Sequence, residues 1–191
     1  MPYTKKHKAK TRELILASAQ SLFSQRGFDS VSVNEVMSNC SLTRGAFYAH
    51  FSSKSELYAE ALRFSVRYSR LTQEKPNYLS NREWLDKLVN GYLSLEHVRG
   101  ERPCPLAFLS KDIVARDKST KEAYGKAYEG MNDVILSYLE PEAGFDKQSI
   151  YALTSMSIGA VSISRTLDNT AMVKKILSSS RDQVRLILEA C

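Results

Sequence analysis

Apolar residues recur at helical spacing along the chain, and no segment alternates apolar with polar residues for long enough to predict a strand. The first helical segment runs from about Lys6 to Gln25 and has one apolar face. Gly27 follows it as the expected stop, because glycine tolerates the left-handed backbone that ends many helices. The pattern predicts an all-α protein of about nine helices.

Capping signals then mark a group of short elements. Ser32 and Ser53 each begin a capping box, in which a glutamate follows the serine by three residues, and Thr43 is the expected cap of a helix between them. The predicted elements are a helix at about 32–39, a turn at 40–42, a helix at about 43–51 and a long helix at about 53–72. Two short helices joined by a tight turn predict a helix-turn-helix.

The remainder of the chain is divided by prolines and further capping signals. The predicted helices start at Ser80 and pass Tyr92, run from Pro105 to about Ala115, run from a cap at Ser119 to Leu139, and occupy about 147–166 and 170–190. We therefore expect a helix-turn-helix domain at residues 1–52 and a helical ligand-binding and dimerisation domain at residues 53–191. The helix at 53–72 links the two.

Excess positive charge is confined to the first part of the chain. Residues 1–70 hold eleven Lys and Arg against five Asp and Glu, whereas residues 71–191 hold sixteen of each. The net charge of +6 therefore belongs to the segment with the predicted helix-turn-helix. Such a segment is expected to face a polyanion, and the natural candidate is double-stranded DNA.

Other classes of protein are disfavoured. No run of 18 or more uncharged apolar residues predicts a transmembrane helix, and the basic N-terminus lacks the apolar stretch of a signal peptide, so we expect no membrane and a cytoplasmic location. The cysteines are Cys40, Cys104 and Cys191, and they form neither close pairs nor a Cys/His cluster. No catalytic constellation or Gly-rich phosphate loop is visible. We expect no enzyme activity, no cofactor and no metal.

The helix that begins at Thr43 has the composition of a DNA-reading helix. Gly45 and Ala46 are small enough for close approach to base edges, and Arg44 can bind guanine through two hydrogen bonds. The expected phosphate contacts are Tyr48, His50 and Lys54, with Ser32, Thr43 and the tail residues Lys5, Lys6, Lys8 and Lys10 as further candidates. His50 has no ligand-type neighbour beside it, which disfavours a metal or catalytic role.

The stretch from Leu14 to Leu57 resembles the signature of the tetracycline-repressor (TetR) family. The matching marks are IL-x-x-A, LF-x-x-x-G-F, VSV and T-x-G-x-F-Y-x-H-F-x-x-K. The resemblance implies a homodimer of subunits with a three-helix DNA-binding head and a larger helical ligand-binding body. It also implies that Thr43 to Ala46 face the bases and that Tyr48, His50 and Lys54 bind phosphate. One departure is residues 40–42, Cys-Ser-Leu, where the family usually has Ala-Gly-Val. Ser41 lacks the conformational freedom of glycine, so this turn is expected to be slightly strained.

The same resemblance implies a ligand cavity among the middle helices, where pockets between helices commonly lie. Trp84, Tyr92, Phe108 and Tyr128 are the candidate ligand-binding residues, although each of them would be ordinary core in most helical proteins. Cys104 is a candidate thiol sensor, because a helix N-terminus and the nearby Arg99 and Arg102 are expected to lower its pKa. A packing role is the alternative that we favour for this cysteine.

The last two helices are the expected dimer contact. Small residues on helix 147–166 and apolar residues on helix 170–190 suit a four-helix bundle across a two-fold axis, and burial against the subunit's own body is the alternative. The function predicted is a DNA-binding transcriptional regulator, a repressor that a small-molecule effector releases from a near-palindromic operator. Redox or electrophile sensing through Cys104 is one alternative. The other is a DNA-associated factor without a ligand.

Overall fold

The computed structural model describes residues 5–67, 74–100, 103–139 and 147–189, and every regular element within these ranges is a helix. The helices are α1 (Lys5–Arg26), α2 (Val33–Asn39), α3 (Arg44–Phe47), α4 (Lys54–Arg67), α5 (Asn81–Tyr92), α6 (Leu95–Arg99), α7 (Pro105–Phe108), α8 (Ser110–Val114), α9 (Lys118–Ser137), α10 (Lys147–Thr166) and α11 (Thr170–Glu189). The all-α prediction is confirmed. Positions 68–72 of the predicted linking helix and position 190 of the last predicted helix lie outside the described residues.

The described part of the chain holds eleven helices rather than about nine. The predicted helix at 105–115 is interrupted at Leu109, which ends α7 and precedes α8. In addition, the five-residue α6 forms separately after α5, capped by the Ser94 side chain. Short helical turns of this kind have no full period of apolar residues, so periodicity does not reveal them.

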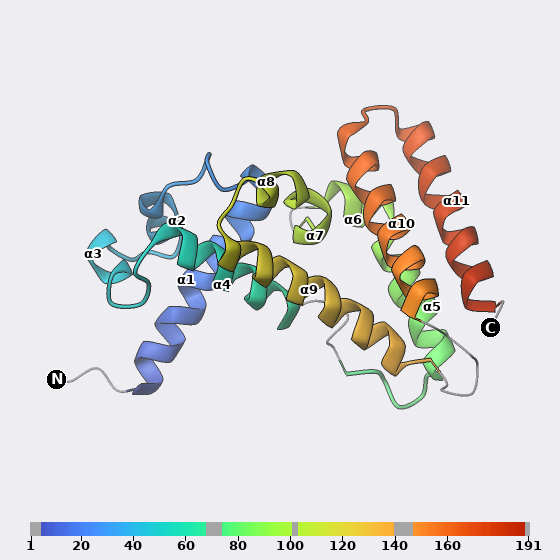
Figure 1. Ribbon diagram of the computed structural model, residues 1–191, viewed down its shortest axis with the longest axis horizontal. Coiled ribbons are helices and arrows are strands. Elements are labelled where there is room, and N and C mark those ends of the chain that lie inside the picture. Colours follow the sequence, from blue (N-terminus) through green and yellow to red (C-terminus); the bar gives the residue numbers. More distant parts are fainter. Residues whose placement is uncertain (1–4, 68–73, 101–102, 140–146, 190–191) are drawn as a thin grey trace.

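The molecule is elongated, with α1–α4 at one end of its long axis and α10 and α11 at the other (Figure 1). The helix α9 runs between the two ends, packing against α4 and also against α10. We call α1–α4 the head and α5–α11 the body. This arrangement gives the chain two hydrophobic cores, one in each part.

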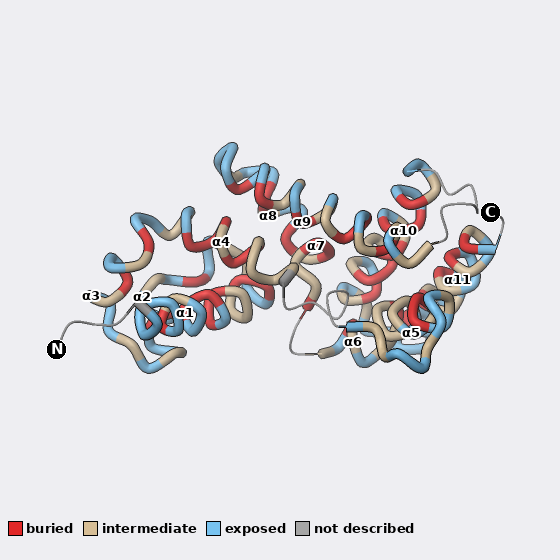
Figure 2. The backbone as a smooth tube through the Cα atoms, turned by 90° about the horizontal axis from the view of Figure 1, so that it is seen from below, coloured by how far each residue is buried: buried red, intermediate tan, exposed pale blue. Residues whose placement is uncertain are grey.

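Aromatic rings fill the core of the head. Phe23, Phe47, Phe51 and Tyr58 are all almost completely buried, and the rings of Phe23 and Tyr58 meet edge to face at 4.9 Å. Buried positions lie along both α1 and α4 (Figure 2). The head core also includes Leu109, Ile113 and Ala123 from the body, so the two parts share a packed boundary.

Two backbone positions with positive φ shape the turns of the head. Gly27 has φ 76° and ends α1, with its N–H bonded to the carbonyl of Phe23 at 2.8 Å, as the sequence predicts. Ser41 has φ 57° and is the only other described residue in this region of backbone space. The strain expected in the turn between α2 and α3 is therefore present at Ser41.

Replacing Ser41 with glycine should stabilise the protein. Holding a non-glycine residue in the left-handed region costs roughly 1–2 kcal/mol, and part of the gain is offset because glycine loses more backbone freedom on folding. We expect Ser41→Gly to raise the free energy of unfolding by about 0.5–1 kcal/mol in urea denaturation. Since the side chain of Ser41 is exposed, Ser38→Gly within α2 is the control and should destabilise. An unchanged or lowered stability for Ser41→Gly contradicts the strain argument.

The capping predictions were correct at two helix starts and differ in detail at three others. Capping boxes are present at Ser32 with Glu35 and at Ser80 with Glu83. At the start of α4, Ser53 accepts a hydrogen bond from the N–H of Glu56, but the Glu56 carboxylate accepts from Ser52 instead of Ser53. For α9 the prediction was wrong, because the cap is Asp117, whose carboxylate accepts from the N–H of Thr120 at 2.9 Å. Thr43 stands at the N-cap of α3 but makes no capping bond with its side chain.

The body is built around α9 and the hairpin of α10 and α11. The helix α10 packs against α9 and α11 and also contacts α6 and α7, whereas α5 packs against α11 and α6. Tyr124 on α9 donates to the carbonyl of Leu106 in α7 at 2.6 Å, and Arg165 on α10 donates to the carbonyl of Val98 in α6 at 2.9 Å. These bonds fasten the short helices to the long ones. Within the described ranges, no helix is both long enough and apolar enough to cross a membrane.

Candidate nucleic-acid interface and cavity

The short helix α3 is anchored through one side and exposed on the other. Phe47 and Phe51 are buried with their rings stacked at a centroid distance of 5.8 Å. Regular helix ends at Phe47, earlier than the predicted end near Phe51, because the N–H groups of His50 and Phe51 both bond back to the carbonyl of Phe47 in a tight turn. Both rings still point inward as the sequence predicts.

The opposite side of α3 presents the residues that the sequence selects for base contacts. Thr43, Arg44 and Gly45 are exposed, and Ala46 is half-buried. A side chain at Gly45 would meet only the Thr43 hydroxyl, at 3.9 Å, so the surface of α3 is open there. The arginine, with small residues beside it, is thus free to enter a groove.

Tyr48 and His50 follow α3 and differ in their surroundings. Tyr48 is 62% exposed, and its ring stands edge-on against the buried Phe47. His50 is half-buried, and burial is the main cause that lowers its pKa, followed by the positive charges of Lys8 and Arg12 on α1. The imidazole is therefore neutral at pH 7 and can donate one N–H. Its Nδ1 is buried without a hydrogen-bond partner.

Lys54, in the first turn of α4, is held by an aromatic ring. Its Nζ lies 4.1 Å from the centroid of Phe28, and the guanidinium of Arg116 lies 4.6 Å from the same centroid. Burial is the largest cause that lowers the pKa of Lys54, and the positive Arg116 adds to it, whereas Asp29 opposes it. The ring stabilises both cations and fixes the direction of the lysine.

A carboxylate from the body binds the same corner of the head. Asp112 on α8 accepts hydrogen bonds from the backbone N–H of Phe28 at 2.9 Å and from the hydroxyl of Tyr58 at 2.7 Å. Arg116 pairs with Asp112 at 3.5 Å and, through two nitrogens, with Asp29. Burial and the Asp112 carboxylate both raise the pKa of Tyr58, so this phenol stays protonated and donates. The loop after α1 is thus bonded to α8.

The other predicted phosphate contacts lie on the outside of the head. Ser32 is exposed and its oxygen caps α2, which leaves its hydroxyl proton available to a phosphate. Lys6, Lys8 and Lys10 are exposed on α1, whereas the side chain of Lys5 lies outside the described residues. The positive charge of the head is therefore presented near the start of α1 and α3.

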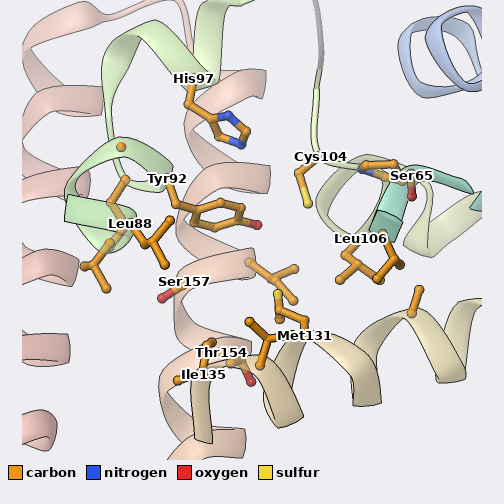
Figure 3. Close-up of a pocket in the computed structure, with 18 of the residues that line it drawn as sticks. Ser65, Leu88, Tyr92, His97, Cys104, Leu106, Met131, Ile135, Thr154 and Ser157 are labelled. Atoms are coloured by element: carbon orange, nitrogen blue, oxygen red, sulfur yellow. The ribbon is translucent and has the colours of Figure 1, made fainter. Parts of the chain in front are cut away.

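A cavity of about 740 Å³ lies between the helices of the body and the head helix α4 (Figure 3). Its wall is formed by residues of α4, α5, α7, α9 and α10, with Gln20 of α1, Leu188 of α11 and the α6 region completing it. Of the candidate ligand residues, Tyr92 lines this cavity, whereas Trp84, Phe108 and Tyr128 do not. Trp84 is core, Phe108 packs under the guanidinium of Arg165, and Tyr128 bonds to Thr154 and stacks with Tyr151.

Most of the cavity wall could not be predicted from the sequence, because it consists of aliphatic residues that the sequence does not distinguish from residues of the hydrophobic core. The labelled wall residues in Figure 3 are Ser65, Leu88, Tyr92, His97, Cys104, Leu106, Met131, Ile135, Thr154 and Ser157. The polar members Thr154 and Ser157 stand three apart on α10, one turn of helix. Polar residues on the inner face of an otherwise apolar helix were the available signal.

Cys104 also lines the cavity and stands at the N-cap of α7. The expectation that its pKa is lowered was wrong: enclosure by protein raises the pKa of this thiol and outweighs the nearby N–H groups of Leu106 and Ala107. Arg99 points elsewhere, donating to the carbonyl of Leu167 at 2.6 Å, and Arg102 lies outside the described residues. The thiol is therefore protonated at pH 7.

The two predicted dimer helices divide their apolar residues between two faces. On α11, Val173, Leu177, Val184 and Leu188 are buried in the subunit's own body. Large apolar residues remain exposed on both helices, namely Tyr151, Ile163, Met172 and Leu186. On α10, Gly159 has open space at its Cβ position, and Ser155 is exposed.

Three comparisons with known proteins agree with this geometry. The family described as "Bacterial regulatory proteins, tetR family" matches residues 15–61. The HTH-type transcriptional regulator AcrR of Shigella flexneri is 46% identical over 57 residues, which cover 30% of this chain and 26% of AcrR. The HTH-type transcriptional repressor BepR of Brucella suis biovar 1 is 30% identical over 115 residues, which cover 60% of this chain and 45% of BepR. The chain thus matches less than half the length of these relatives.

Solved structures resemble the whole described fold. The reduced form of E. coli NemR has a TM-score of 0.77 at 20% identity, covering 92% of this chain and 95% of NemR. A TetR transcriptional regulator from Legionella pneumophila has a TM-score of 0.74 at 19% identity, covering 97% of this chain and 98% of that one. At these identities the likeness establishes the fold: an N-terminal helix-turn-helix followed by a helical domain.

Proposed function

Because the chain belongs to the tetR family of bacterial regulatory proteins, we propose that it is a repressor that leaves its operator when a small molecule occupies the cavity. Members of this family are DNA-binding transcriptional regulators and not enzymes. The observation that carries the proposal is the combination of an exposed, anchored α3 on a positively charged head with a 740 Å³ cavity in the neutral body.

On DNA, α3 lies in the major groove. Arg44 binds a guanine edge, and Thr43, Gly45 and Ala46 approach the neighbouring bases. The phosphate contacts come from Ser32, Tyr48, His50 and Lys54, which surround α3. Their exposed or half-buried positions and the Phe28 ring behind Lys54 support these roles.

Two copies of the head act together through a homodimer formed by α10 and α11. The exposed apolar side chains on these two helices support a contact there, since four helices can pack across a two-fold axis. The two copies of α3 then reach successive major grooves, roughly 34–36 Å apart or somewhat more, on a near-palindromic operator.

Two connections carry the effect of the ligand to the head. The helix α4 contributes to the head core and, through Ser65 and Val66, to the cavity wall. The second connection is the segment from Pro103 to Arg116. This segment begins at Pro103 in the cavity wall, and Leu106 also lines the cavity. Six residues further on, Asp112 accepts a hydrogen bond from the backbone N–H of Phe28 in the loop after α1. A ligand that displaces α7 therefore displaces α8 and tilts the head, and such coupling typically amounts to about 1–3 kcal/mol.

Selection from a random duplex pool, followed by footprinting, tests the DNA-binding part of this function. The expected result is a near-palindromic footprint whose affinity falls when a cavity ligand is added. Selection of no sequence contradicts the function. A specific footprint that no cavity-bound molecule weakens would instead favour a DNA-associated factor without a ligand.

Thiol sensing through Cys104 is the second candidate, and it is supported by the position of the thiol in the cavity wall. A buried, protonated thiol reacts slowly, because the thiolate is the nucleophile. We therefore expect iodoacetamide at pH 7 to change the operator affinity of the wild type and of Cys104→Ser equally. Cys40→Ser is the matched control. Loss of operator binding in the wild type and in Cys40→Ser, with protection in Cys104→Ser, would establish the sensor.

A further inference from the structure

We infer that the cavity takes an uncharged, largely apolar molecule that carries a hydrogen-bond acceptor, and that Tyr92 is the residue that binds this acceptor. The inference rests on the proposed function only in treating this ligand as the effector, since the binding itself is independent of DNA. It follows from the charge of the wall, from its aromatic content and from the hydrogen bonding of Tyr92.

The cavity wall contains almost no charge. Among the described residues that line it there is no lysine, arginine or aspartate. Besides Tyr92 and Cys104, its ionisable side chains are the exposed Glu96 and the imidazole of His97, both at the α6 side. A ligand anion would therefore lose its hydration without gaining a permanently charged positive partner. The free energy lost on burying an unpaired charge exceeds the free energy that any single apolar contact of the ligand would gain. Carboxylates and phosphates are disfavoured as ligands.

A ligand cation is disfavoured by the same wall. Proteins that bind organic cations in apolar sites surround them with aromatic faces, and Tyr92 is the only Phe, Tyr or Trp among the described lining residues. The deeper wall is instead aliphatic, formed by residues such as Leu88, Met131 and Ile135 (Figure 3). A single carboxylate at the exposed side gives a cation no enclosed partner.

Tyr92 supplies the polar part of the site. Its ring extends from α5 into the cavity, with the hydroxyl on the side of Cys104 (Figure 3). That hydroxyl is buried and has no oxygen or nitrogen partner. Its polar neighbour is the thiol of Cys104, and sulfur is a weak acceptor. A donor in this state gains a full hydrogen bond when a ligand carbonyl or ether takes the place of the thiol.

The hydroxyls across the cavity do not compete for this donor role. Thr154 and Ser157 on α10 already donate to backbone carbonyls of their own helix, Ile150 at 2.9 Å and Leu153 at 2.8 Å. They can still accept a bond from a ligand. Among the hydroxyls of the wall, the phenol of Tyr92 is thus the donor that a ligand acceptor can use, and it selects ketones, ethers and similar neutral groups over plain hydrocarbons.

A matched series of naphthalenes tests both halves of the inference on the full-length protein without DNA. N-Phenyl-1-naphthylamine, which is neutral and fluoresces in apolar surroundings, reports occupancy, and the four competitors are 2-acetylnaphthalene, 2-ethylnaphthalene, 2-naphthoate and 2-naphthyltrimethylammonium. We expect the ketone to displace the probe most tightly, with both ions at least about tenfold weaker. Equal displacement by either ion overturns the charge argument, and failure of the probe to bind overturns the inference as a whole.

Substitution of Tyr92 separates a hydrogen bond from general packing. Tyr92→Phe should weaken the binding of the ketone by about three- to tenfold and leave the affinity for 2-ethylnaphthalene unchanged. Tyr138→Phe removes a hydroxyl from a body tyrosine outside the cavity wall, and it should change neither the affinity for the ketone nor that for 2-ethylnaphthalene. Equal losses for ketone and hydrocarbon in Tyr92→Phe would show that Tyr92 is not the donor. Ser157→Phe, which fills the cavity, should abolish probe binding, and retained binding there places the ligand elsewhere.

The two hypotheses fail in different experiments. If the protein binds selected DNA but none of the naphthalenes, this inference is contradicted and the DNA-binding function stands. If the protein binds the ketone through Tyr92 but selects no DNA sequence, the inference stands and the proposed function is contradicted.

Discussion

Replacing Asp112 with alanine is expected to lower the free energy of unfolding by about 3 kcal/mol. The substitution removes the acceptor for the backbone N–H of Phe28 and for the hydroxyl of Tyr58, a residue that is completely buried. Each buried donor that loses its partner costs about 1–3 kcal/mol, whereas the exchange of a satisfied bond for water costs much less. Urea denaturation followed by circular dichroism measures the change.

The matched control is Asp29→Ala, which removes the other carboxylate that Arg116 binds. Asp29 is 75% exposed, and exposed ion pairs contribute about 0–1 kcal/mol, so this variant should remain close to the wild type. A double-mutant cycle of Asp112→Ala with Tyr58→Phe should show strong coupling, because both changes remove the same bond. If Asp112→Ala is no more destabilising than Asp29→Ala, the carboxylate does not hold the head to the body.

The contact of Asp112 with the head shows where sequence reasoning stops. The elements themselves were predictable, because Gly27, the Ser32 capping box and the paired phenylalanines of α3 are local signals that act within a few residues. Asp112 gave no such signal: its partners Phe28 and Tyr58 lie 84 and 54 positions away. Bonds of that separation depend on the packing of α8 into the head core, which no local pattern encodes.

The cavity illustrates the same limit for the body. Tyr92 was selected with three other aromatic residues of the middle helices, where the resemblance implies a ligand cavity, but packing alone decided which ring faces the cavity. Cys104 shows the complementary error. Its position at a helix start correctly suggested nearby N–H groups, but enclosure by the body, which the sequence does not show, raises its pKa instead of lowering it. The charge of the head and the capping box at Ser32 could be predicted locally, whereas burial could not.

The residues predicted to contact DNA are exposed or half-buried on and around α3, so substitutions among them can separate base reading from phosphate binding. Arg44→Ala is expected to weaken binding to a duplex recovered by selection by about 10- to 100-fold and to relax the preference at one position of each half-site. The physical reason is the loss of a two-bond contact to guanine by an exposed side chain on α3.

Lys54→Ala should behave differently in the same fluorescence-anisotropy titration. A phosphate contact carries no sequence information, so its loss weakens selected and scrambled duplexes alike and reduces the slope of log affinity against log salt by about one per contact. Lys87→Ala is the control, because Lys87 is exposed on α5, which lies towards the opposite end of the molecule from α3 (Figure 1). If Arg44→Ala weakened all duplexes equally, or if Lys54→Ala altered base preference while leaving the salt slope unchanged, α3 and α4 would not lie on DNA in the orientation proposed.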